Sequence, residues 1–361
     1  HRLNDGGRLI DRSKPVSYQF NAKRMSGFAG DTLASALLAN GVSIVGRSFK
    51  LRRPRGIVGS GAEEPNAIMQ IGKGAHAQPT SRATQVELYD GLVAKTTKGW
   101  PGARFDLGVI NDVFSKVFSA GFYYKTFMRP KSWWHLYERF IRASAGFGRA
   151  PTEEDPDRYE HRNAHCDVLI AGGGPSGLAA ALAAGQAGAR VILADDQSEF
   201  GGSLLSAKQR VGNVAATEWV RQTVETLAAL DNVTLLPRST VFGYYDHNFL
   251  AIAERCTDHL PEEERAGVRQ RLWRVRAKRG VLAQGAFERP LAVREEQRRL
   301  DQLQFAQQRL AVVVVNDVDA CVEQVARGER HDAFSQREVL RVDALEPANA
   351  LVGAVEPRRL V

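Results

Sequence analysis

Cysteine is scarce in this chain, and that scarcity limits the chemistry the sequence can support. Three cysteines occur among 361 residues, and they lie far apart at Cys166, Cys256 and Cys321. They form no C-x-x-C pair and no complete set of thiolate ligands, which excludes a disulfide framework, a zinc site and an iron–sulfur cluster. Such usage is typical of a reducing compartment, so we expect a cytoplasmic protein.

Long apolar runs and a concentration of charge of one sign are also missing. No apolar run approaches the length of a membrane span. The 49 lysines and arginines are interleaved with 41 acidic residues along the chain, although the net charge is +8. We therefore expect no membrane and no nucleic acid as partner, and attribute the charge to a solvated surface or to an acidic neighbouring subunit. Because the chain opens on His1 rather than methionine, we expect a piece of a longer protein.

A glycine-rich stretch between an apolar run and an alanine-rich run is the strongest signal present. Residues 166–171 predict a buried strand that leads through glycines into a helix. Gly172, Gly174 and Gly177 fit the G-x-G-x-x-G pattern of dinucleotide sites. The first glycine permits the tight turn, the second lets a pyrophosphate approach the backbone, and the third lets the helix lie close to the strand. The helix N-terminus then offers unpaired N–H groups to the phosphates.

The context of these glycines favours a dinucleotide site over a glycine turn without a ligand. Residues 190–194 predict a second buried strand that ends at Asp195, about twenty residues beyond the glycines. A carboxylate at this place accepts hydrogen bonds from the adenosine ribose hydroxyls. Pro175 within the pattern, and Gly201-Gly202 after the second strand, favour the variant found in flavoproteins that bind two dinucleotides.

The first 90 residues predict a β-grasp domain. Residues 16–20 and the stretch after them alternate like a hairpin, and a helix follows, with Asp31 as its N-cap and Asn40 at its end. Residues 46–56 correspond to the cluster loop of a plant-type ferredoxin but contain no cysteine. We therefore expect residues 1–90 to form a ferredoxin-like domain without a cluster, in which the basic run is a structural or subunit-docking loop rather than an anion site.

Residues 91–164 predict an aromatic, helical connector that ends in an acidic linker over 151–157. Aromatic side chains crowd into residues 114–140, which indicates an apolar face for a neighbouring domain or subunit rather than a cofactor box. We therefore expect the chain to need a partner for stability. His161 and His165 lie beside Cys166, but a metal site is not favoured because the cysteine already enters a buried strand.

Residues 165–291 predict a Rossmann-like FAD/NAD(P)-binding domain, so the fold class is α/β. Val241 falls where the backbone normally meets the adenine, and Gly285 ends a strand that returns to the cofactor. The other expected elements are a helix over 215–230, a helix-like run over 249–255 with Cys256 in the core, and strands over 232–236, 273–278 and 280–285.

No general base, nucleophile or metal constellation stands out in the sequence. Asp246 and His247 could pair for acid–base chemistry, but adjacent residues on an extended segment point to opposite faces. The chemistry is therefore expected to be that of a bound cofactor, which the protein positions.

Five longer runs resemble the alpha subunit of heterotetrameric sarcosine oxidase: 48–56, 64–67, 242–248, 257–261 and 286–291. The resemblance covers residues 1–291 and implies NAD binding at the glycine pattern, with FAD as the alternative ligand. The contacts it implies are Gly172, Gly173, Gly174, Pro175, Ser176, Gly177, Asp195, Asp196, Gln197, Gly202, Ser203, Val241 and Gly285.

The resemblance also implies partners and a reaction. A beta subunit carries FAD and the sarcosine site, a covalent FMN lies at the boundary with the alpha subunit, and small gamma and delta subunits complete the heterotetramer. This flavoprotein family of one-carbon metabolism converts sarcosine to glycine, hydrogen peroxide and a one-carbon unit, which passes to tetrahydrofolate or leaves as formaldehyde. The alternatives are the alpha subunit of a related amino-acid or opine dehydrogenase, and a non-catalytic subunit whose nucleotide fold serves assembly.

The sequence departs from the family's pattern near its end. Gln284 stands where the family usually has threonine, which removes a hydroxyl near the cofactor. Residues 292–361 do not continue the second nucleotide domain: 294–309 is charged and indicates a helix, 310–317 resembles the strand that opens the next family unit, and the tail shows no pattern. The chain also stops before the folate-binding region, so we expect a truncated or frameshifted product.

Overall fold

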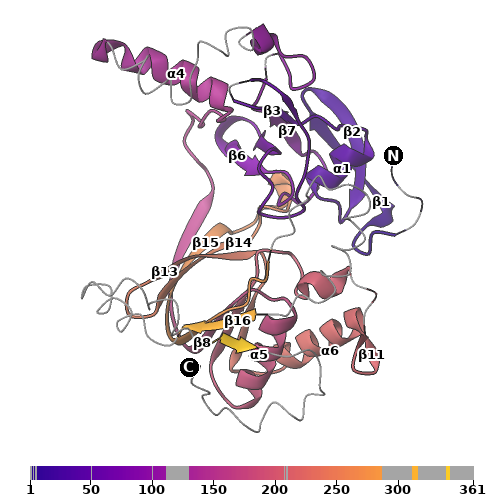
Figure 1. The fold of residues 1–361 in the computed structure, drawn as a ribbon, viewed down its shortest axis with the longest axis vertical. Helices are drawn as coiled ribbons and strands as arrows, with labels where there is room; N and C mark the ends of the chain where they lie inside the picture. The colour runs from indigo at the N-terminus through magenta and orange to yellow at the C-terminus, as the bar shows by residue number, and fades with distance from the viewer. Residues whose placement is uncertain are drawn as a thin grey trace, which may run out of the picture. The chain divides into compact units, whose positions relative to one another are not determined.

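The chain divides into two units in the computed structural model. One unit combines the chain up to Arg158 with Thr257–Arg269, and the other combines Tyr159–Cys256 with Gln270–Ala286. Figure 1 colours the chain by residue number and labels its elements. The residues that the structure describes are 2, 4, 6–49, 51–99, 101–110, 130–206, 208, 210–286, 311–315 and 339–341.

The first unit contains a mixed sheet and one helix that covers it. Its elements are β1 (Asp11–Phe20), β2 (Lys23–Ala29), α1 (Leu33–Ala39), β3 (Gly46–Arg47), β4 (Pro54–Arg55), β5 (Ile68–Ile71), η1 (Gly74–His76), β6 (Gln78–Arg82), β7 (Val93–Thr96), η2 (Leu107–Val109), η3 (Lys131–Trp133), α4 (Trp134–Ala145) and η5 (Glu262–Glu264). The sheet order is β2-β1-β7-β5-β6, with β1 and β2 antiparallel and β7 parallel to β1. Leu33 and Leu37 of α1 are fully buried in one core with Tyr18 and Met69 of the sheet. This is the predicted β-grasp arrangement.

Side-chain caps fix both ends of α1. Thr32 is the N-cap residue, because its hydroxyl accepts the Ser35 N–H while the Ser35 hydroxyl accepts the Thr32 N–H. The prediction that Asp31 caps the helix is wrong: its buried carboxylate pairs with Arg2 and accepts the Ser35 hydroxyl instead. Asn40 is the C-cap residue, at the predicted end of the helix.

The first unit extends beyond the boundary predicted at residue 90. β7 completes its sheet, so the connector predicted over 91–164 begins inside the domain. The segment over 151–157 was predicted to be a linker, but its last residue is not solvent-exposed. The side chain of Asp157 is largely covered there and pairs with Arg269, which lies 112 residues later in the chain. A partner so distant in sequence leaves no local pattern from which it could be predicted.

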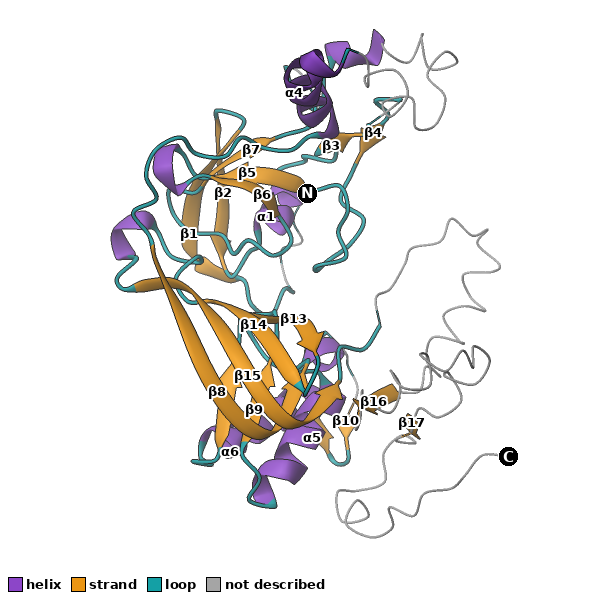
Figure 2. Cartoon of the chain, turned by 90° about the vertical axis from the view of Figure 1, so that its left-hand side faces the viewer, coloured by secondary structure: helices purple, strands orange, loops and turns teal. Residues whose placement is uncertain are grey.

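The second unit is built on one mixed sheet, whose parallel strands continue into antiparallel ones. Its elements are β8 (Arg158–Ala171), α5 (Pro175–Gln186), β9 (Val191–Ala194), η4 (Gly202–Leu205), β10 (Arg210–Val211), β11 (Val214–Ala215), α6 (Ala216–Ala228), β12 (Val233–Leu236), β13 (Ser239–Tyr245), β14 (Phe249–Arg255), β15 (Val268–Leu282), β16 (Ala311–Val315) and β17 (Val339–Arg341). β12, β9 and β8 are parallel, and β15, β14 and β13 continue the sheet. Figure 2 shows these long strands with α5 and α6 beside them. The predicted second domain start at 165 falls inside β8.

Apolar side chains of β8 alternate between the two faces of the sheet and contribute to a core on each face. Ile170 packs in one cluster with Leu178 of α5 and Leu227 of α6. Its neighbour Leu169 packs in the other cluster, with residues of the antiparallel strands such as Trp273. Because successive side chains of a strand point to opposite faces, one apolar run serves both cores. The parallel strands joined by helices confirm the predicted Rossmann-like α/β domain.

Three predicted elements of this domain are wrong in type or extent. The run over 249–255, predicted as helix-like, is strand β14, because cross-strand pairing with β13 and β15 overrides its local pattern. The strands predicted over 273–278 and 280–285 are one strand, β15, which ends at Leu282. Asp246 and His247 lie in the turn between β13 and β14 rather than on an extended segment, and His247 has a φ of +58°.

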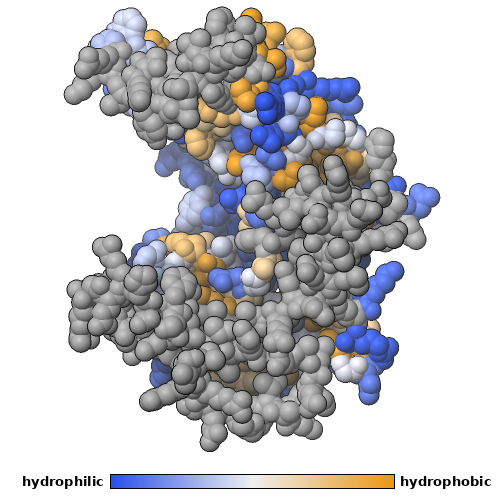
Figure 3. Space-filling view, viewed as in Figure 1, coloured by the Kyte–Doolittle hydropathy of each residue, from blue (hydrophilic) through white to orange (hydrophobic). Residues whose placement is uncertain are grey.

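Other predictions fall partly or wholly outside the described residues. The helix over 294–309 and most of the aromatic segment over 114–140 lie there, whereas the strand predicted over 310–317 is β16. Where the aromatic segment is described, Trp133 and Trp134 are exposed. Figure 3 shows that other apolar side chains also reach the surface of the first unit.

Among the described residues, no helix is both long enough and apolar enough to span a bilayer.

Candidate dinucleotide-binding site

The glycine turn between β8 and α5 owes its shape to two glycines that leave no room for a side chain. Gly172 has a φ of +106°, and a Cβ built there would lie 2.5 Å from the Ala283 carbonyl oxygen. A Cβ on Gly177 would lie 1.8 Å from the Gly172 carbonyl oxygen. The turn and the close helix packing therefore require glycine at both places, as the pattern predicts.

Gly174 differs from these two glycines because it faces open space. A Cβ built there meets no atom within 4 Å, and its φ of −72° is ordinary for any residue. Gly174 is also the N-cap of α5, where no side chain caps the helix, Pro175 occupies the first turn and no acidic residue follows in that turn. The positive end of the helix dipole is therefore left uncompensated beside an open volume.

Ser176 adds an unpaired polar atom to this helix start. Its Oγ atom is buried and has no hydrogen-bond partner among the described residues. A buried hydroxyl without a partner costs free energy unless a ligand or water satisfies it. The open space at Gly174, the helix N-terminus without a side-chain cap and this hydroxyl together fit the pyrophosphate of a dinucleotide.

Asp195 lies directly after β9, as predicted, and its carboxylate is already engaged. Oδ2 accepts the Gly173 N–H at 2.5 Å, and Oδ1 accepts the Gln197 N–H at 2.9 Å. Burial raises the pKa of this carboxyl above its ordinary value, against the two backbone N–H groups that lower it. Asp195 therefore links the glycine turn to the segment that follows β9.

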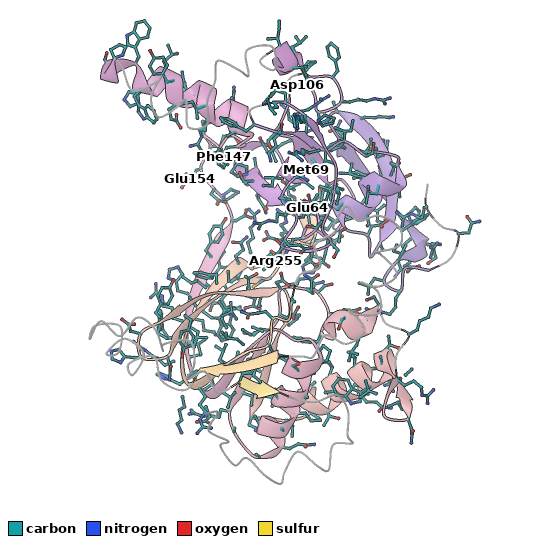
Figure 4. All side chains as sticks on the ribbon, in the orientation of Figure 1. Glu64, Met69, Asp106, Phe147, Glu154 and Arg255 are labelled. Carbon is teal, nitrogen blue, oxygen red and sulfur yellow. The ribbon has the colours of Figure 1, made fainter. Side chains whose placement is uncertain are left out.

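Several contacts hold residues 195–197 in place. The Asp196 backbone oxygen accepts the Arg255 guanidinium at 2.6 Å, and Figure 4 labels this arginine at the end of β14. The Gln197 backbone oxygen accepts the Arg238 N–H at 2.8 Å, and the Gln197 side-chain amide donates to Asp196 Oδ1 at 2.8 Å. These bonds fix the backbone of the predicted ribose-binding segment.

The Gly201-Gly202 pair closes over the glycine turn, as its place in the sequence suggests. The Gly201 N–H donates to the Gly173 carbonyl at 2.7 Å. Gly202 has a φ of +52°, and a Cβ built there would lie 3.0 Å from the Cα atom of Gly174. Ser203 follows on η4 and is exposed. The pair thus approaches the open volume beside Gly174, and a side chain at Gly202 would narrow it.

The two remaining predicted residues lie apart from these contacts. Val241 is half-buried on β13 and packs against the core cluster that contains Leu169 and Trp273. Gly285 is exposed beyond the end of β15. The sequence missed two residues that do contact the turn. The Ala283 N–H donates to the Ala171 carbonyl at 2.8 Å, and a Cβ on Gly173 would lie 2.3 Å from the Phe200 ring. An aromatic residue directly before the Gly-Gly pair was the available signal for Phe200.

Each unit of the chain resembles a known protein family. Residues 13–99 match the family described as 2Fe-2S iron-sulfur cluster binding domain, and residues 167–275 match the family described as FAD dependent oxidoreductase. Over 292 residues, or 81% of the chain, the sequence is 51% identical to the sarcosine oxidase subunit alpha of Rhizobium meliloti (strain 1021). The chain is a relative of sarcosine oxidase alpha subunits. The predicted resemblance and the predicted fold class are confirmed.

The similarity to sarcosine oxidase alpha subunits concerns part of those proteins. The chain spans 30% of the length of the Rhizobium protein, and 26% of the corresponding subunit of Corynebacterium sp. (strain U-96), to which it is 36% identical. A crystal structure of L-proline dehydrogenase from P. horikoshii aligns with 76% of this chain and 42% of its own, at 20% identity and a TM-score of 0.45. A thioredoxin reductase from Gloeobacter violaceus aligns with 38% of this chain and 42% of its own, at 18% identity and a TM-score of 0.26.

The cluster-binding family match applies to a loop without cysteines, since none of the three cysteines falls within residues 13–99. A buried carboxylate organises the segment over 58–67, which follows the loop over 46–56. Glu64 Oε2 accepts the N–H groups of Val58 at 2.7 Å and Gly59 at 2.5 Å. Oε1 accepts those of Asn66 at 2.8 Å and Ala67 at 3.0 Å. Figure 4 labels Glu64 within the first unit.

No metal or thiol site emerges from the parts of the chain that are described. No group of three or more His, Cys, Asp and Glu side chains gathers there as a metal ion requires. His161 is exposed on β8, where its Nδ1 atom lies 3.1 Å from the Arg274 guanidinium. Burial raises the pKa of the Cys166 thiol to about 12, so this thiol stays protonated and unreactive at neutral pH.

Proposed function

We propose that this chain binds an adenine dinucleotide at the glycine turn, as part of the alpha subunit of a sarcosine oxidase-type oxidoreductase. The observation that carries the proposal is the buried, unpartnered Ser176 Oγ atom beside the open space at Gly174. The similarity to sarcosine oxidase alpha subunits over four fifths of the chain supports the enzyme class. The match to a FAD-dependent oxidoreductase family supports a dinucleotide of this type.

Each part of the dinucleotide has a candidate set of contacts. The pyrophosphate would lie on the N–H groups at the start of α5 and on the Ser176 hydroxyl, with Ser203 nearby on η4. The adenosine ribose would lie at residues 195–197, and the adenine near Val241. Gly285 would face the redox-active half. A bound nicotinamide or flavin supplies the electron-transfer chemistry, and the role of this chain is to hold and orient it.

We propose NAD as the ligand, with FAD as its competitor at the same place. The acidic side chains after β9 disfavour NADP, because a carboxylate repels a 2′-phosphate. The proposal of NAD rests on the resemblance to the alpha subunit, whereas the matched family name supports FAD. Both ligands share the ADP half, which is the part that the described residues address.

The relatives' name "subunit alpha" supports a multi-subunit complex. We propose that a beta subunit provides the FAD and the sarcosine site, that FMN lies at the interface with it, and that gamma and delta subunits complete the assembly. In that complex the N-methyl group of sarcosine would be oxidised, with glycine, hydrogen peroxide and either formaldehyde or methylenetetrahydrofolate as products. A cytoplasmic location follows from the same proposal.

The test is to identify the nucleotide that the purified chain carries or takes up. Heat-released ligand is analysed by mass and absorbance, and the ligand-free chain is titrated with NAD and with FAD. Binding of NAD, with Gly174→Ala much weaker, would support the proposal. Tight FAD binding without NAD affinity would reassign the ligand, and no binding of either would leave a subunit whose nucleotide fold serves assembly.

A further inference from the structure

The hydrogen bonds of the buried Glu64 carboxylate repeat the ligand spacing of an iron–sulfur protein. Its Oε2 atom accepts the Gly59 N–H at 2.5 Å, and its Oε1 atom accepts the Ala67 N–H at 3.0 Å. Four residues separate Gly59 from Glu64, and two separate Glu64 from Ala67, as in the C-x4-C-x2-C pattern of plant-type ferredoxins. The cluster spacing therefore falls over residues 59–67 and not over the predicted 46–56.

A later residue, Thr84, lies against the same segment. The Ala83 N–H donates to the Ala67 carbonyl at 2.9 Å, which brings the next residue close to the third position of the pattern. The buried Thr84 hydroxyl donates to the Gly61 carbonyl at 2.7 Å. A plant-type cluster likewise takes its fourth cysteine from a later part of the chain. The four ferredoxin-like ligand positions are then Gly59, Glu64, Ala67 and Thr84.

The backbone N–H groups of this segment gather around one anion. Val58 at 2.7 Å and Asn66 at 2.8 Å donate to the same carboxylate as Gly59 and Ala67. Convergent backbone N–H groups form concave anion sites, among them sites that receive iron–sulfur clusters. None of the four ligand positions holds a cysteine, however, so the residues present do not fit a cluster.

We propose that the Glu64 carboxylate takes the place of an iron–sulfur cluster in the first unit, as a negatively charged acceptor that belongs to the chain itself. The match to the cluster-binding family then reflects the loop and its N–H donors, without the thiolates. An anion is still required at this place, because the N–H groups around an empty site would lose their hydrogen bonds.

The first test restores the thiolates in the full chain. The restored variant combines Gly59→Cys, Glu64→Cys, Ala67→Cys and Thr84→Cys, and is incubated anaerobically with ferrous iron and sulfide. We expect about two irons and two sulfides per chain, with the visible absorption of a 2Fe–2S cluster and its electron paramagnetic resonance signal after reduction. The shifted control keeps the spacing one residue later, with Ser60→Cys, Pro65→Cys, Ile68→Cys and Gln85→Cys. It should show neither signal.

The second test removes the carboxylate without adding thiols. Glu64→Ala leaves the backbone N–H groups around an emptied site, which formate, a small carboxylate, can enter. We expect formate to raise the melting temperature of Glu64→Ala by about 4 °C or more beyond its effect on the wild type, at equal ionic strength in chloride. Glu63→Ala is the matched control, because Glu63 is a half-buried carboxylate of the same segment. Formate should give it no such additional shift.

The two tests together decide the proposal. Cluster formation in the restored variant and not in the shifted control supports it, as does the rescue of Glu64→Ala by formate. A restored variant that is folded by circular dichroism, yet binds no more iron than the shifted control, overturns the assigned ligand positions. If the restored variant does not fold, formate decides: a Glu64→Ala chain that formate neither stabilises nor refolds overturns the role of the carboxylate. Neither test involves a nucleotide, so the result is independent of the proposed function.

Discussion

Single residues of the glycine turn separate the requirements of packing from those of ligand binding. Gly174→Ala should fold with nearly normal stability, within about 1 kcal/mol, because its Cβ meets no neighbour and its φ is ordinary. Its nucleotide affinity should fall by about tenfold or more, since the methyl group enters the volume proposed for the pyrophosphate. Titration and thermal unfolding measure the two effects on one sample.

Gly177→Ala is the matched control for this prediction. Its Cβ would lie 1.8 Å from the Gly172 carbonyl oxygen, so the helix must shift. We expect a loss of about 1–3 kcal/mol in the free energy of unfolding, whether or not nucleotide is present. Equal stability losses in the two variants would contradict the distinction between the glycines.

Cys166 and Cys256 should differ in reactivity because they differ in burial. The raised pKa of Cys166, about 12, keeps its thiol neutral until the solution is strongly alkaline, whereas Cys256 is only half-buried. At pH 8 we expect iodoacetamide to label Cys166 at least about 100-fold more slowly than Cys256 in native protein. Peptide mass spectrometry measures both rates, and labelling in urea provides the reference. Similar native rates would show that Cys166 is accessible.

At the scale of an element, Glu64 organises the segment over 58–67, which follows the cysteine-free loop over 46–56. Its buried carboxylate accepts four backbone N–H groups, two on each oxygen. In Glu64→Gln one oxygen of the buried side chain becomes an amide donor, which leaves two backbone N–H groups without their acceptor. We expect the free energy of unfolding of the first unit to fall by about 2–5 kcal/mol.

Glu63→Gln is the neighbouring control for the loop. Glu63 accepts the Ser60 and Gly61 N–H groups through one oxygen, which is retained in a glutamine. Its substitution should therefore cost less than about 1 kcal/mol. Urea denaturation of both variants tests the comparison, and an effect of Glu64→Gln no larger than that of Glu63→Gln would refute the role given to the buried carboxylate.

At the scale of the whole molecule, the first unit includes a later segment of the chain, Thr257–Arg269, which follows residues Tyr159–Cys256 of the second unit. Arg269, at the end of this segment, is buried and pairs with Asp157 and with Asp258 at 2.6 Å. Arg269→Ala would remove the buried guanidinium that pairs with both carboxylates, and we expect about 3–5 kcal/mol of destabilisation in the first unit. Nucleotide affinity, which belongs to the second unit, should be unchanged.

A control for Arg269 lies on α6. Arg221 pairs with Glu218 and Glu225 at the surface, so Arg221→Ala should change stability by less than about 1 kcal/mol. Differential scanning calorimetry of both variants, with titration of nucleotide into each, tests the pair. A stability loss shared equally by both variants, or nucleotide affinity lost only in Arg269→Ala, would contradict the assignment of Arg269 to the first unit.

The sequence alone determined the parts of this protein whose signals are local. The strand, glycine turn, helix and second strand around residues 166–194 follow from apolar runs and glycine spacing. The β-grasp order follows from a hairpin pattern and a helix stop at Asn40. The absence of cysteine from the loop over 46–56 is likewise visible without coordinates. Each signal depends on backbone sterics or on hydrogen bonds between residues a few positions apart.

Tertiary structure alone decided what the charged residues do. Asp195 was predicted from its distance to the glycines, yet the structure shows its carboxylate bound to the Gly173 N–H, 22 residues earlier. The end of the predicted linker is buried at Asp157 because Arg269 reaches it from 112 residues later. β14 is a strand because two flanking strands pair with it. Partners of this kind are fixed by the packing of distant segments, and no local period or spacing in the sequence encodes them.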